Sequence, residues 1–350
     1  MRWRTTVCSF LLLACGFDIR PALARFEFSE SHMGTRFRIV VYSTTARAAT
    51  LASSAAFERI GKLDATMSDY RETSELMVLC KKPSGTRVSA SKDLFRVLEA
   101  GQALAARSDG AFDITVGPLS RLWRRARRTG ALPDSRDLAR ALDSSGYTKL
   151  RLDRSSRSVI LDKSGMLLDL GGIAKGFATD EAMKILKQHG IRRALVAAGG
   201  DILVSSPPPG ARGWLIAIAP LESTEQQPTR YLRLRDRAVS TSGDAHQYVE
   251  IAGVRYSHII DPRTGFALTG HSSVTVVANN CTTSDSLATA ASVLGPSRGS
   301  RLIDSTAGAA ALFVQATEGR TVTVETNRWK GVPQPASTES IHSHRENTLY

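Results

Sequence analysis

The segment from Asp169 to Ala178 has the residue types of an anion-binding turn. It reads Asp-Leu-Gly-Gly-Ile-Ala-Lys-Gly-Phe-Ala, between a short strand predicted over 167–170 and a helix predicted over 173–188. Unpaired amides and the helix dipole at such a helix start both favour a phosphate. The spacing matches neither a P-loop nor a G-x-G-x-x-G loop, so an ordinary tight turn is the simpler explanation of this segment alone.

Asp285 and Thr289 stand four residues apart where a helix is predicted over 286–294. Residues at this spacing share one helix face. A carboxylate and a hydroxyl on one face, joined by a backbone carbonyl from elsewhere, make an oxygen site suited to Mg²⁺. The alternative is that Asp285 only caps the helix.

The segment from Ser257 to Gly265 places a histidine just before a turn. Its Asp-Pro-x-x-Gly pattern predicts the turn, and His258 stands three residues before Asp261 at the end of a predicted strand. A histidine there can act as a general base in a cleft. The alternative is a capped strand end with an incidental histidine.

Three further segments carry weaker signals. Tyr70 lies in a polar loop predicted over 67–75, where an aromatic side chain could stack on a planar ring. Residues 110–119 predict an entry from a loop into a helix, with Asp113 or Thr115 as the cap. Five arginines between 121 and 128 surround Trp123, and a solvated basic face explains them better than a nucleic-acid site, because no nucleic-acid motif accompanies them.

The remaining pattern predicts an α+β fold with mixed, largely antiparallel sheets. Early segments have helical periodicity over 46–63, 94–106, from 118 and from 133 to about 145, and a hairpin is predicted over 150–153 and 159–162. Later segments predict strands joined by short turns. These are 194–198, 214–219, 231–234, 247–251, 255–260, 273–278 and 311–315.

The composition of the chain limits the class of protein to which it can belong. The chain has 350 residues, of which 42% are hydrophobic, and a formal net charge of +13. This composition excludes a disordered tail, a collagen and a small disulfide-rich domain, while the charge alone would suit nucleic acid, an anionic membrane or an acidic ligand as partner.

No cysteine spacing suggests zinc. Cys80 and Cys281 are either a pair or two free thiols.

The N-terminus predicts export. Arg2 and Arg4 precede an apolar run over 7–17, and Ala22-Leu23-Ala24 ends in an A-x-A pattern typical of a signal peptide cut after Ala24. The run is too short to span a bilayer. The alternative is a lipoprotein signal in which Cys15 is acylated. We therefore expect a signal peptide over 1–24, one domain or two subdomains over 25–324, and a loose tail over 325–350.

Taken together and in order, these segments resemble the ApbE family, the FAD:protein FMN transferases. The resemblance extends from about 26 to about 324. The matching blocks are 33–35, 67–70, 74–76, 110–119, 169–178, 199–201, 241–244, 258–265 and 285–289.

The resemblance implies an exported periplasmic enzyme that binds FAD, cleaves its pyrophosphate with Mg²⁺, joins FMN to a Thr or Ser hydroxyl of an acceptor protein and releases AMP. It implies that Asp285, Thr289 and the carbonyl of Gly172 bind the metal. His258 is implied as the base, with Asp261 supporting its turn. The implied FAD-site residues are Met33, Tyr70, Ala111, Phe112, Asp113, Asp169 and Lys175.

The chain departs from the family at two places. Cys80 follows Leu79 where the family usually has Asn, and Ala245-His246 replace an aromatic residue. Both changes bear on how the isoalloxazine is held or how the acceptor docks. The competing functions are a periplasmic Mg²⁺-dependent FAD pyrophosphatase and a non-catalytic flavin-binding protein. The excess positive charge predicts an acidic acceptor or association with an anionic membrane surface.

Overall fold

The computed structural model describes residues 22–221, 230–244, 247–317 and 320–335. The predicted signal peptide up to residue 21, with Cys15, lies outside the described residues, as do Ala245 and His246. Ala24, the predicted cleavage position, is the first residue of strand β1. Among the described helices, none is both long and apolar enough to cross a bilayer.

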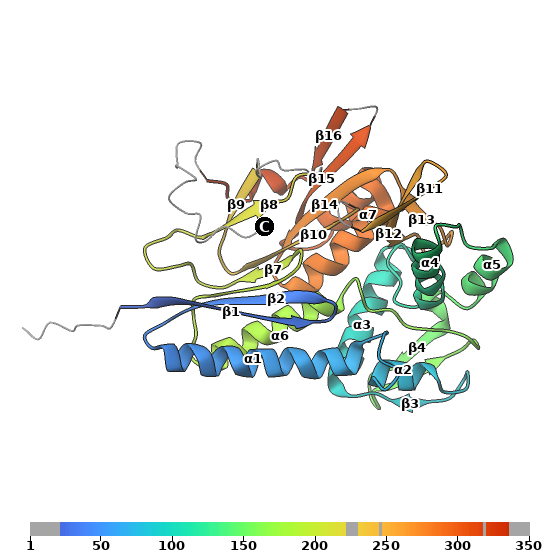
Figure 1. The fold of residues 1–350 in the computed structure, drawn as a ribbon, viewed down its shortest axis with the longest axis horizontal. Helices are drawn as coiled ribbons and strands as arrows, with labels where there is room; N and C mark the ends of the chain where they lie inside the picture. Colours follow the sequence, from blue (N-terminus) through green and yellow to red (C-terminus); the bar gives the residue numbers. More distant parts are fainter. Residues whose placement is uncertain (1–21, 222–229, 245–246, 318–319, 336–350) are drawn as a thin grey trace, which may run out of the picture.

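An antiparallel sheet of eight strands forms the centre of the molecule, and its order is β1-β2-β6-β7-β10-β14-β15-β16 (Figure 1). The α+β prediction is confirmed. The strands are β1 (Ala24–His32), β2 (Thr35–Ser43), β6 (Ala194–Ala198), β7 (Asp201–Val204), β10 (Arg237–Gly243), β14 (His271–Ala278), β15 (Ala310–Thr317) and β16 (Arg320–Glu325).

Side chains of the inner strands alternate between two apolar cores, because successive strand residues point to opposite faces. In β6, Val196 packs into the larger core and Leu195 into the smaller one. The smaller core lies beneath a two-stranded sheet of β8 (Trp214–Ile218) and β9 (Arg230–Leu234). Both faces of β6 are therefore buried, which explains its continuous apolar sequence.

Three helices cover the face of the larger core. They are α1 (Ala46–Met67), α6 (Ala174–Gln188) and α7 (Cys281–Asp304), and α6 packs against both α1 and α7 (Figure 1). Helix α7 begins five residues before the predicted start, because Asn280 caps it by accepting from the Thr283 amide. This places Asp285 inside the second turn rather than at the cap.

A smaller lobe packs at one end of the sheet. Helices α4 (Gly117–Thr129) and α5 (Ser135–Asp143) share an apolar core with the sheet of β11 (Tyr248–Ile251), β12 (Val254–Ile260) and β13 (Ala267–Thr269). The Trp123 indole nitrogen donates to the Gly265 carbonyl at 2.8 Å, and its ring lies 5.2 Å from that of Tyr256. This lobe fixes β12, and with it His258.

The remaining elements surround this frame. They are α2 (Glu75–Cys80), α3 (Lys92–Arg107), η1 (Tyr147–Lys149), η2 (Trp329–Gly331) and the small sheet of β3 (Val88–Ser89), β5 (Ser158–Leu161) and β4 (Leu150–Asp153). The predicted strand over 167–170 is wrong: only Leu167 forms a bridge, to Val116, because this segment is used to hold the start of α4.

The two cysteines of the domain are free thiols. Cys281 is fully buried at the start of α7, and the Cys80 sulfur accepts from the Leu168 amide at 3.4 Å. Burial raises the pKa of both thiols, which lowers their reactivity.

The prediction of a loose tail over 325–350 is wrong for its first part. Trp329 is 1% exposed and Val332 is 9% exposed, and both lie in the smaller core. The Pro333 carbonyl accepts from the Arg233 amide at 2.8 Å. The polar composition of the segment gave no sign of this packing, because two buried apolar side chains are enough to hold a short segment against the core. Residues 336–350 lie outside the described part.

We expect Trp329→Ala to lower the free energy of unfolding by about 3–5 kcal/mol, the usual cost of truncating a buried aromatic side chain. Guanidinium denaturation followed by circular dichroism measures it. The control is Val322→Ala in β16, where the side chain is 48% exposed. Equal effects of the two variants would contradict the packing of the tail.

Candidate functional site

The start of α6 and the second turn of α7 meet at a buried carboxylate. Asp285, whose side chain is 3% exposed, accepts through Oδ2 from the Gly176 amide at 3.0 Å. A Cβ atom at Gly176 would collide with the Cys281 carbonyl, so only glycine allows this approach. Helix α6 thereby directs its N-terminus at Asp285.

The three predicted metal ligands come together at this crossing. Thr289 lies one turn after Asp285 on α7, and a Cβ atom built on Gly172 would lie 3.1 Å from Thr289 Oγ1. The Ser242 hydroxyl of β10 lies 3.4 Å from the same Oγ1. Carboxylate, hydroxyl and carbonyl oxygens are the donor set of a hard cation, so these residues fit Mg²⁺. The described residues hold no cluster of three His, Cys, Asp or Glu side chains suited to a metal, and the predicted site requires only one of them.

Lys175 joins this cluster through two carboxylates. Its ammonium pairs with Asp201 of β7 and lies 3.7 Å from Asp285 Oδ1. Burial and the charge of Asp201 raise the pKa of Asp285 to about 7, against the opposing effect of Lys175. One lysine therefore faces two buried carboxylates, and a further cation at this place would favour the ionised form of Asp285.

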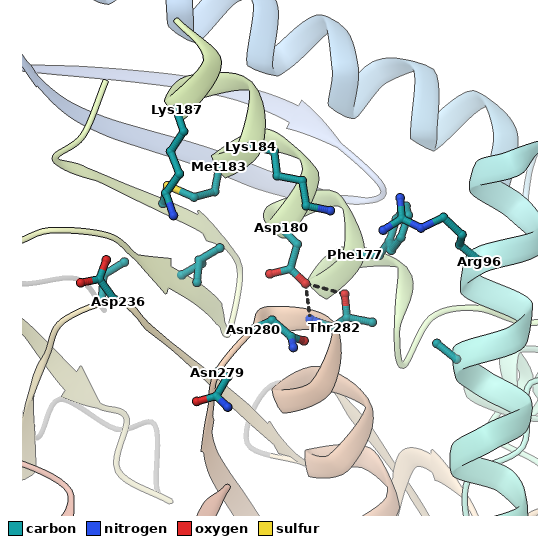
Figure 2. Close-up of a pocket in the computed structure, with 13 residues that line it drawn as sticks. Arg96, Phe177, Asp180, Met183, Lys184, Lys187, Asp236, Asn279, Asn280 and Thr282 are labelled. Carbon is teal, nitrogen blue, oxygen red and sulfur yellow. Dashed lines mark hydrogen bonds between the residues drawn. The ribbon is translucent and has the colours of Figure 1, made fainter. Parts of the chain in front are cut away.

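Asp180, on the second turn of α6, fixes the position of α7. Its carboxylate accepts from the amides of Cys281 and Thr282 at 2.8 and 2.9 Å, and from the Thr282 hydroxyl at 2.5 Å. Figure 2 shows Asp180 hydrogen-bonded to Thr282 in the wall of a cavity of about 450 Å³ that both residues line. None of the predicted site residues lines this cavity, so it is not part of the predicted site.

Arg124 of α4 connects Asp169 and Tyr70. Its guanidinium donates to Asp69 at 2.5 Å and to Asp169 at 3.0 Å, and it lies 4.3 Å from the centre of the Tyr70 ring. The other Asp169 oxygen accepts from the Gly171 amide at 2.8 Å. Tyr70 itself is 75% exposed, so one ring face rests on a cation while the ring remains accessible to a ligand.

The residues from Ala111 to Asp113 lie beneath this surface. All three are buried, and the Phe112 ring would lie 3.2 Å from a Cβ atom on Gly172. Asp113 accepts from the Thr115 amide and hydroxyl, both at 2.7 Å, and burial raises its pKa. The structure therefore uses the Asp113 carboxylate to hold its own loop.

Met33 occupies the tight turn between β1 and β2. Met33 and Gly34 both have positive φ, 50° and 70°, as a type I′ hairpin turn requires. The neighbouring Thr35 hydroxyl would lie 3.1 Å from a Cβ atom on Gly199. Met33 therefore lies near the turn between β6 and β7 that precedes Asp201.

His258 of β12 has the tautomer that a base requires. Its Nδ1 lies 3.2 Å from the Gln247 carbonyl; because a carbonyl only accepts, Nδ1 carries the proton and Nε2 has the free lone pair. The residue reaches solvent. Loss of hydration around the ring, together with the positive charges of Arg127 and Lys175, nevertheless lowers the pKa of His258 to about 4. The imidazole is thus neutral at pH 7.

Asp261 does not contact His258. Its carboxylate accepts from the Arg263 amide at 3.0 Å and from the guanidinium at 2.8 and 2.7 Å. This pair stabilises the turn that follows β12, as the resemblance implies, and it occupies both carboxylate oxygens. Arg263 is consequently paired and does not face the α6 crossing as a free cation.

Asp244 and Arg255 connect the hairpin of β11 and β12 to the central sheet. The Asp244 carboxylate pairs with Arg255 and accepts from His271 and the Ser272 amide, each at 2.9 Å. Burial opposes its charge, but these donors lower the pKa of Asp244 below the usual value. Arg255 also stacks 3.4 Å over Tyr248. This contact sets the position of His258 relative to β10.

Sequence reasoning missed Arg124, Asp201 and the pair of Asp244 and Arg255. Asp201 and Asp244 both end glycine-containing blocks of the family pattern, and that signal could have marked them. The sequence groups Arg124 with the other arginines of residues 121–128 as one solvated basic face. Only the structure shows that its side chain binds Asp69 and Asp169 instead. In sum, the site presents an oxygen donor set, an accessible aromatic ring and a neutral imidazole.

The chain matches known proteins over most of its length. The model of the ApbE family matches residues 33–313. An FAD:protein FMN transferase of Treponema pallidum is 33% identical over 328 residues, covering 89% of this chain and 91% of that protein. The solved flavin transferase ApbE of Vibrio cholerae has a TM-score of 0.81 and 27% identity, covering 89% and 99% of the two chains. The ApbE protein of Thermotoga maritima gives a TM-score of 0.79 and 31% identity, covering 89% and 100%.

We expect Arg124→Gln to lower the free energy of unfolding by about 1–3 kcal/mol at pH 7, because two carboxylates lose their common donor. The pKa of Asp69, already raised by burial and by Asp169, should rise further. A carboxyl with a raised folded-state pKa destabilises the protein above that pKa, so the loss should shrink as the pH falls toward 4. Urea denaturation at the two pH values measures it.

The double variant Asp69→Asn with Arg124→Gln is the control, and it should recover part of the loss at pH 7. A loss independent of pH would show that Arg124 acts by packing alone.

Proposed function

The chain belongs to the ApbE family, and from this we propose how its site works as an FAD:protein FMN transferase. The enzyme moves FMN from FAD to an acceptor protein. The observation that carries the assignment is the crossing of α6 and α7, where Gly172, Asp285 and Thr289 meet beside Lys175. A helix N-terminus with its dipole, the ammonium of Lys175 and an oxygen donor set at one place suit a pyrophosphate and its metal.

Asp285, Thr289 and the Gly172 carbonyl are proposed to hold Mg²⁺. A bound Mg²⁺ would neutralise charge on the pyrophosphate that FAD presents to the site. Asp201 keeps Lys175 beside this position, and Asp180 holds α7 against α6, so the donors are arranged before FAD binds. Pre-arranged donors avoid the cost of reorganisation during the reaction.

His258 is proposed as the base that activates the acceptor hydroxyl, since a hydroxyl is a poor nucleophile at neutral pH. The hydroxyl proton passes to Nε2 while the oxygen forms a bond to the FMN phosphorus. The bond from that phosphorus to the bridging oxygen breaks, and AMP leaves with the oxygen. The pKa of about 4 keeps the imidazole in its neutral form over the whole physiological range.

The flavin is proposed to lie against Tyr70 and Met33. Tyr70 offers an exposed ring supported by Arg124, and Asp169 is held beside it by the same guanidinium. Ala111, Phe112 and Asp113 support this surface from below through the contact of Phe112 with Gly172. Lys175 is proposed to face the phosphates from between its two carboxylates.

We further infer an exported, periplasmic enzyme, with a lipid anchor at Cys15 as the alternative to cleavage after Ala24. The signal-like sequence over 1–24 supports export. The acceptor is then a periplasmic or membrane electron-transfer protein that carries the modified Thr or Ser. Nucleic acid is not an expected partner.

Incubation with FAD, Mg²⁺ and a periplasmic electron-transfer domain should add the mass of FMN to the acceptor and release AMP. His258→Gln should slow this transfer by about 10²–10⁴-fold, the usual contribution of a general base, while flavin fluorescence reports unchanged FAD binding. Intact-protein mass spectrometry measures the product. If free FMN instead forms at the same rate with and without the acceptor, the protein is a pyrophosphatase.

Asp285→Asn should abolish metal-dependent transfer, because a neutral amide binds Mg²⁺ poorly. Isothermal titration with Mg²⁺ in the presence of FAD gives a readout apart from activity, and the variant should show no saturable metal binding. Asp143→Asn is the matched control, since its exposed carboxylate pairs with Lys163 away from the α6 and α7 crossing. Equal loss of metal binding in both variants would contradict the assignment.

A further inference from the structure

The guanidinium of Arg255 in β12 contacts two residues that lie on either side of Gln247. Its Nε atom donates to the Asp244 carboxylate, and its Nη2 atom donates to the Asp244 carbonyl at 2.7 Å. Its central carbon lies 3.4 Å from the centre of the Tyr248 ring. Asp244 precedes Gln247 by three residues, and Tyr248 follows it directly. One side chain therefore joins the chain before Gln247 to the chain after it.

The Asp244 carboxylate is a fixed anchor for Arg255. The Asp244 side chain is 3% exposed, and its other oxygen accepts from His271 Nδ1 and from the Ser272 amide, each at 2.9 Å. His271 and Ser272 begin β14 of the central sheet. A buried carboxylate that is satisfied by several donors makes the surrounding structure rigid. Arg255 is therefore tied to the central sheet as well as to its own hairpin.

The Gln247 carbonyl contacts two nitrogen atoms of His258. The His258 amide donates to this carbonyl at 3.0 Å, and Nδ1 of the ring lies 3.2 Å from it. The hydrogen bond of one ring nitrogen decides which nitrogen of a neutral histidine carries the proton. Without this acceptor, part of the population would carry the proton on Nε2. That form has no lone pair on Nε2, where the proposed base must accept a proton.

Strand pairing alone gives this carbonyl little support. Strand β11 has four residues, and its first ladder pair with β12 joins Tyr248 to Ser257. Gln247 precedes that pair, at the end of the ladder, where local opening costs least. Arg255 and Tyr248 are diagonal neighbours across the two strands, within reach of an aromatic and a long side chain. The contacts of Arg255 thus act where the ladder is weakest.

We propose that Arg255 is a positioning residue that keeps the base of the reaction in its active tautomer. This inference rests on the proposed role of His258 as that base. The two contacts of Arg255 keep the Gln247 carbonyl in place, and the carbonyl keeps the imidazole proton on Nδ1. Lysine would supply the charge without the arrangement, because only a planar guanidinium donates from two nitrogens at fixed angles while it stacks on a ring.

The tautomer can be measured in the purified enzyme labelled with nitrogen-15 histidine, because the chemical shift of a ring nitrogen depends strongly on whether it carries a proton. Spectra are recorded at pH 8, above the ordinary pKa of histidine, and signals that are missing in His258→Gln belong to His258. Native enzyme should show a protonated Nδ1 and an unprotonated Nε2. Arg255→Gln and Arg255→Lys should both show shifts averaged between the two tautomers.

The transfer assay gives the second readout. Arg255→Gln and Arg255→Lys should each lower kcat by about 10–100-fold, as when a group that orients a metal-binding histidine is removed. The affinity for FAD, measured by flavin fluorescence, should be unchanged, because Arg255 acts through the Gln247 carbonyl. A loss of kcat that accompanies the change of tautomer separates positioning of the base from general damage to the fold.

A matched pair of variants tests the same contact without touching the buried ion pair. Tyr248 is 41% exposed, so Tyr248→Ala should fold, and it should change the tautomer and lower kcat in the same direction as the Arg255 variants. Tyr248→Phe keeps the ring and should restore the native tautomer and kcat. Arg47→Gln, at an exposed position on α1, removes one positive charge elsewhere and should behave as native enzyme.

Four results would overturn the proposal. The first is a mixture of tautomers in the native enzyme, and the second is the native tautomer in all variants of Arg255 and Tyr248. The third is native kcat in Arg255→Lys, because charge alone would then suffice. The fourth is a loss of FAD affinity in Arg255→Gln as large as its loss of kcat, which would place Arg255 on FAD itself. Absence of FMN transfer by the native enzyme would instead refute the transferase assignment, since the tautomer is measured without turnover.

Discussion

The close crossing of α6 and α7 is the constraint on which the site depends. Gly176 lets the two helices approach until its amide reaches Asp285, and Asp180 binds the first amides of α7 from the other side. One glycine and two aspartates thereby set the register between the helix that follows the Gly171-Gly172 turn and the helix that carries Asp285 and Thr289. The antiparallel sheet supports this crossing because both helices pack on its larger core.

Sequence patterns predicted the elements that obey simple periodicity. Strand β6 is apolar throughout, and α1 and α3 have regular apolar spacing, so each was placed within a few residues. Strand β10 escaped prediction because Ser240 and Thr241 are typical of loops; in the structure they pair with Ser284 and Thr275 inside the protein. Polar residues satisfied by one another across elements leave no periodic signal in a single sequence.

The site residues that lie close together in sequence were predictable, and those that meet only through the fold were not. The spacing of Asp285 and Thr289 and the glycines of residues 171–172 were visible, because local geometry follows from local sequence. The partner of Asp261 was local as well, yet its pairing with Arg263 rather than with His258 depends on how the turn leaves β12. Arg124 binds carboxylates 55 and 45 residues away in sequence, and such long-range contacts require the fold.

Lys175 is a counter-ion to the two buried carboxylates beside the proposed metal position. Its ammonium pairs with Asp201 and lies 3.7 Å from Asp285, so one covalently attached cation offsets part of the charge of the two buried carboxylates. In small zinc domains, by contrast, metal binding supplies the folding free energy. Here Lys175 is already present in the folded chain, so burial of Asp201 and Asp285 does not require a bound metal, and we expect the domain to fold without one.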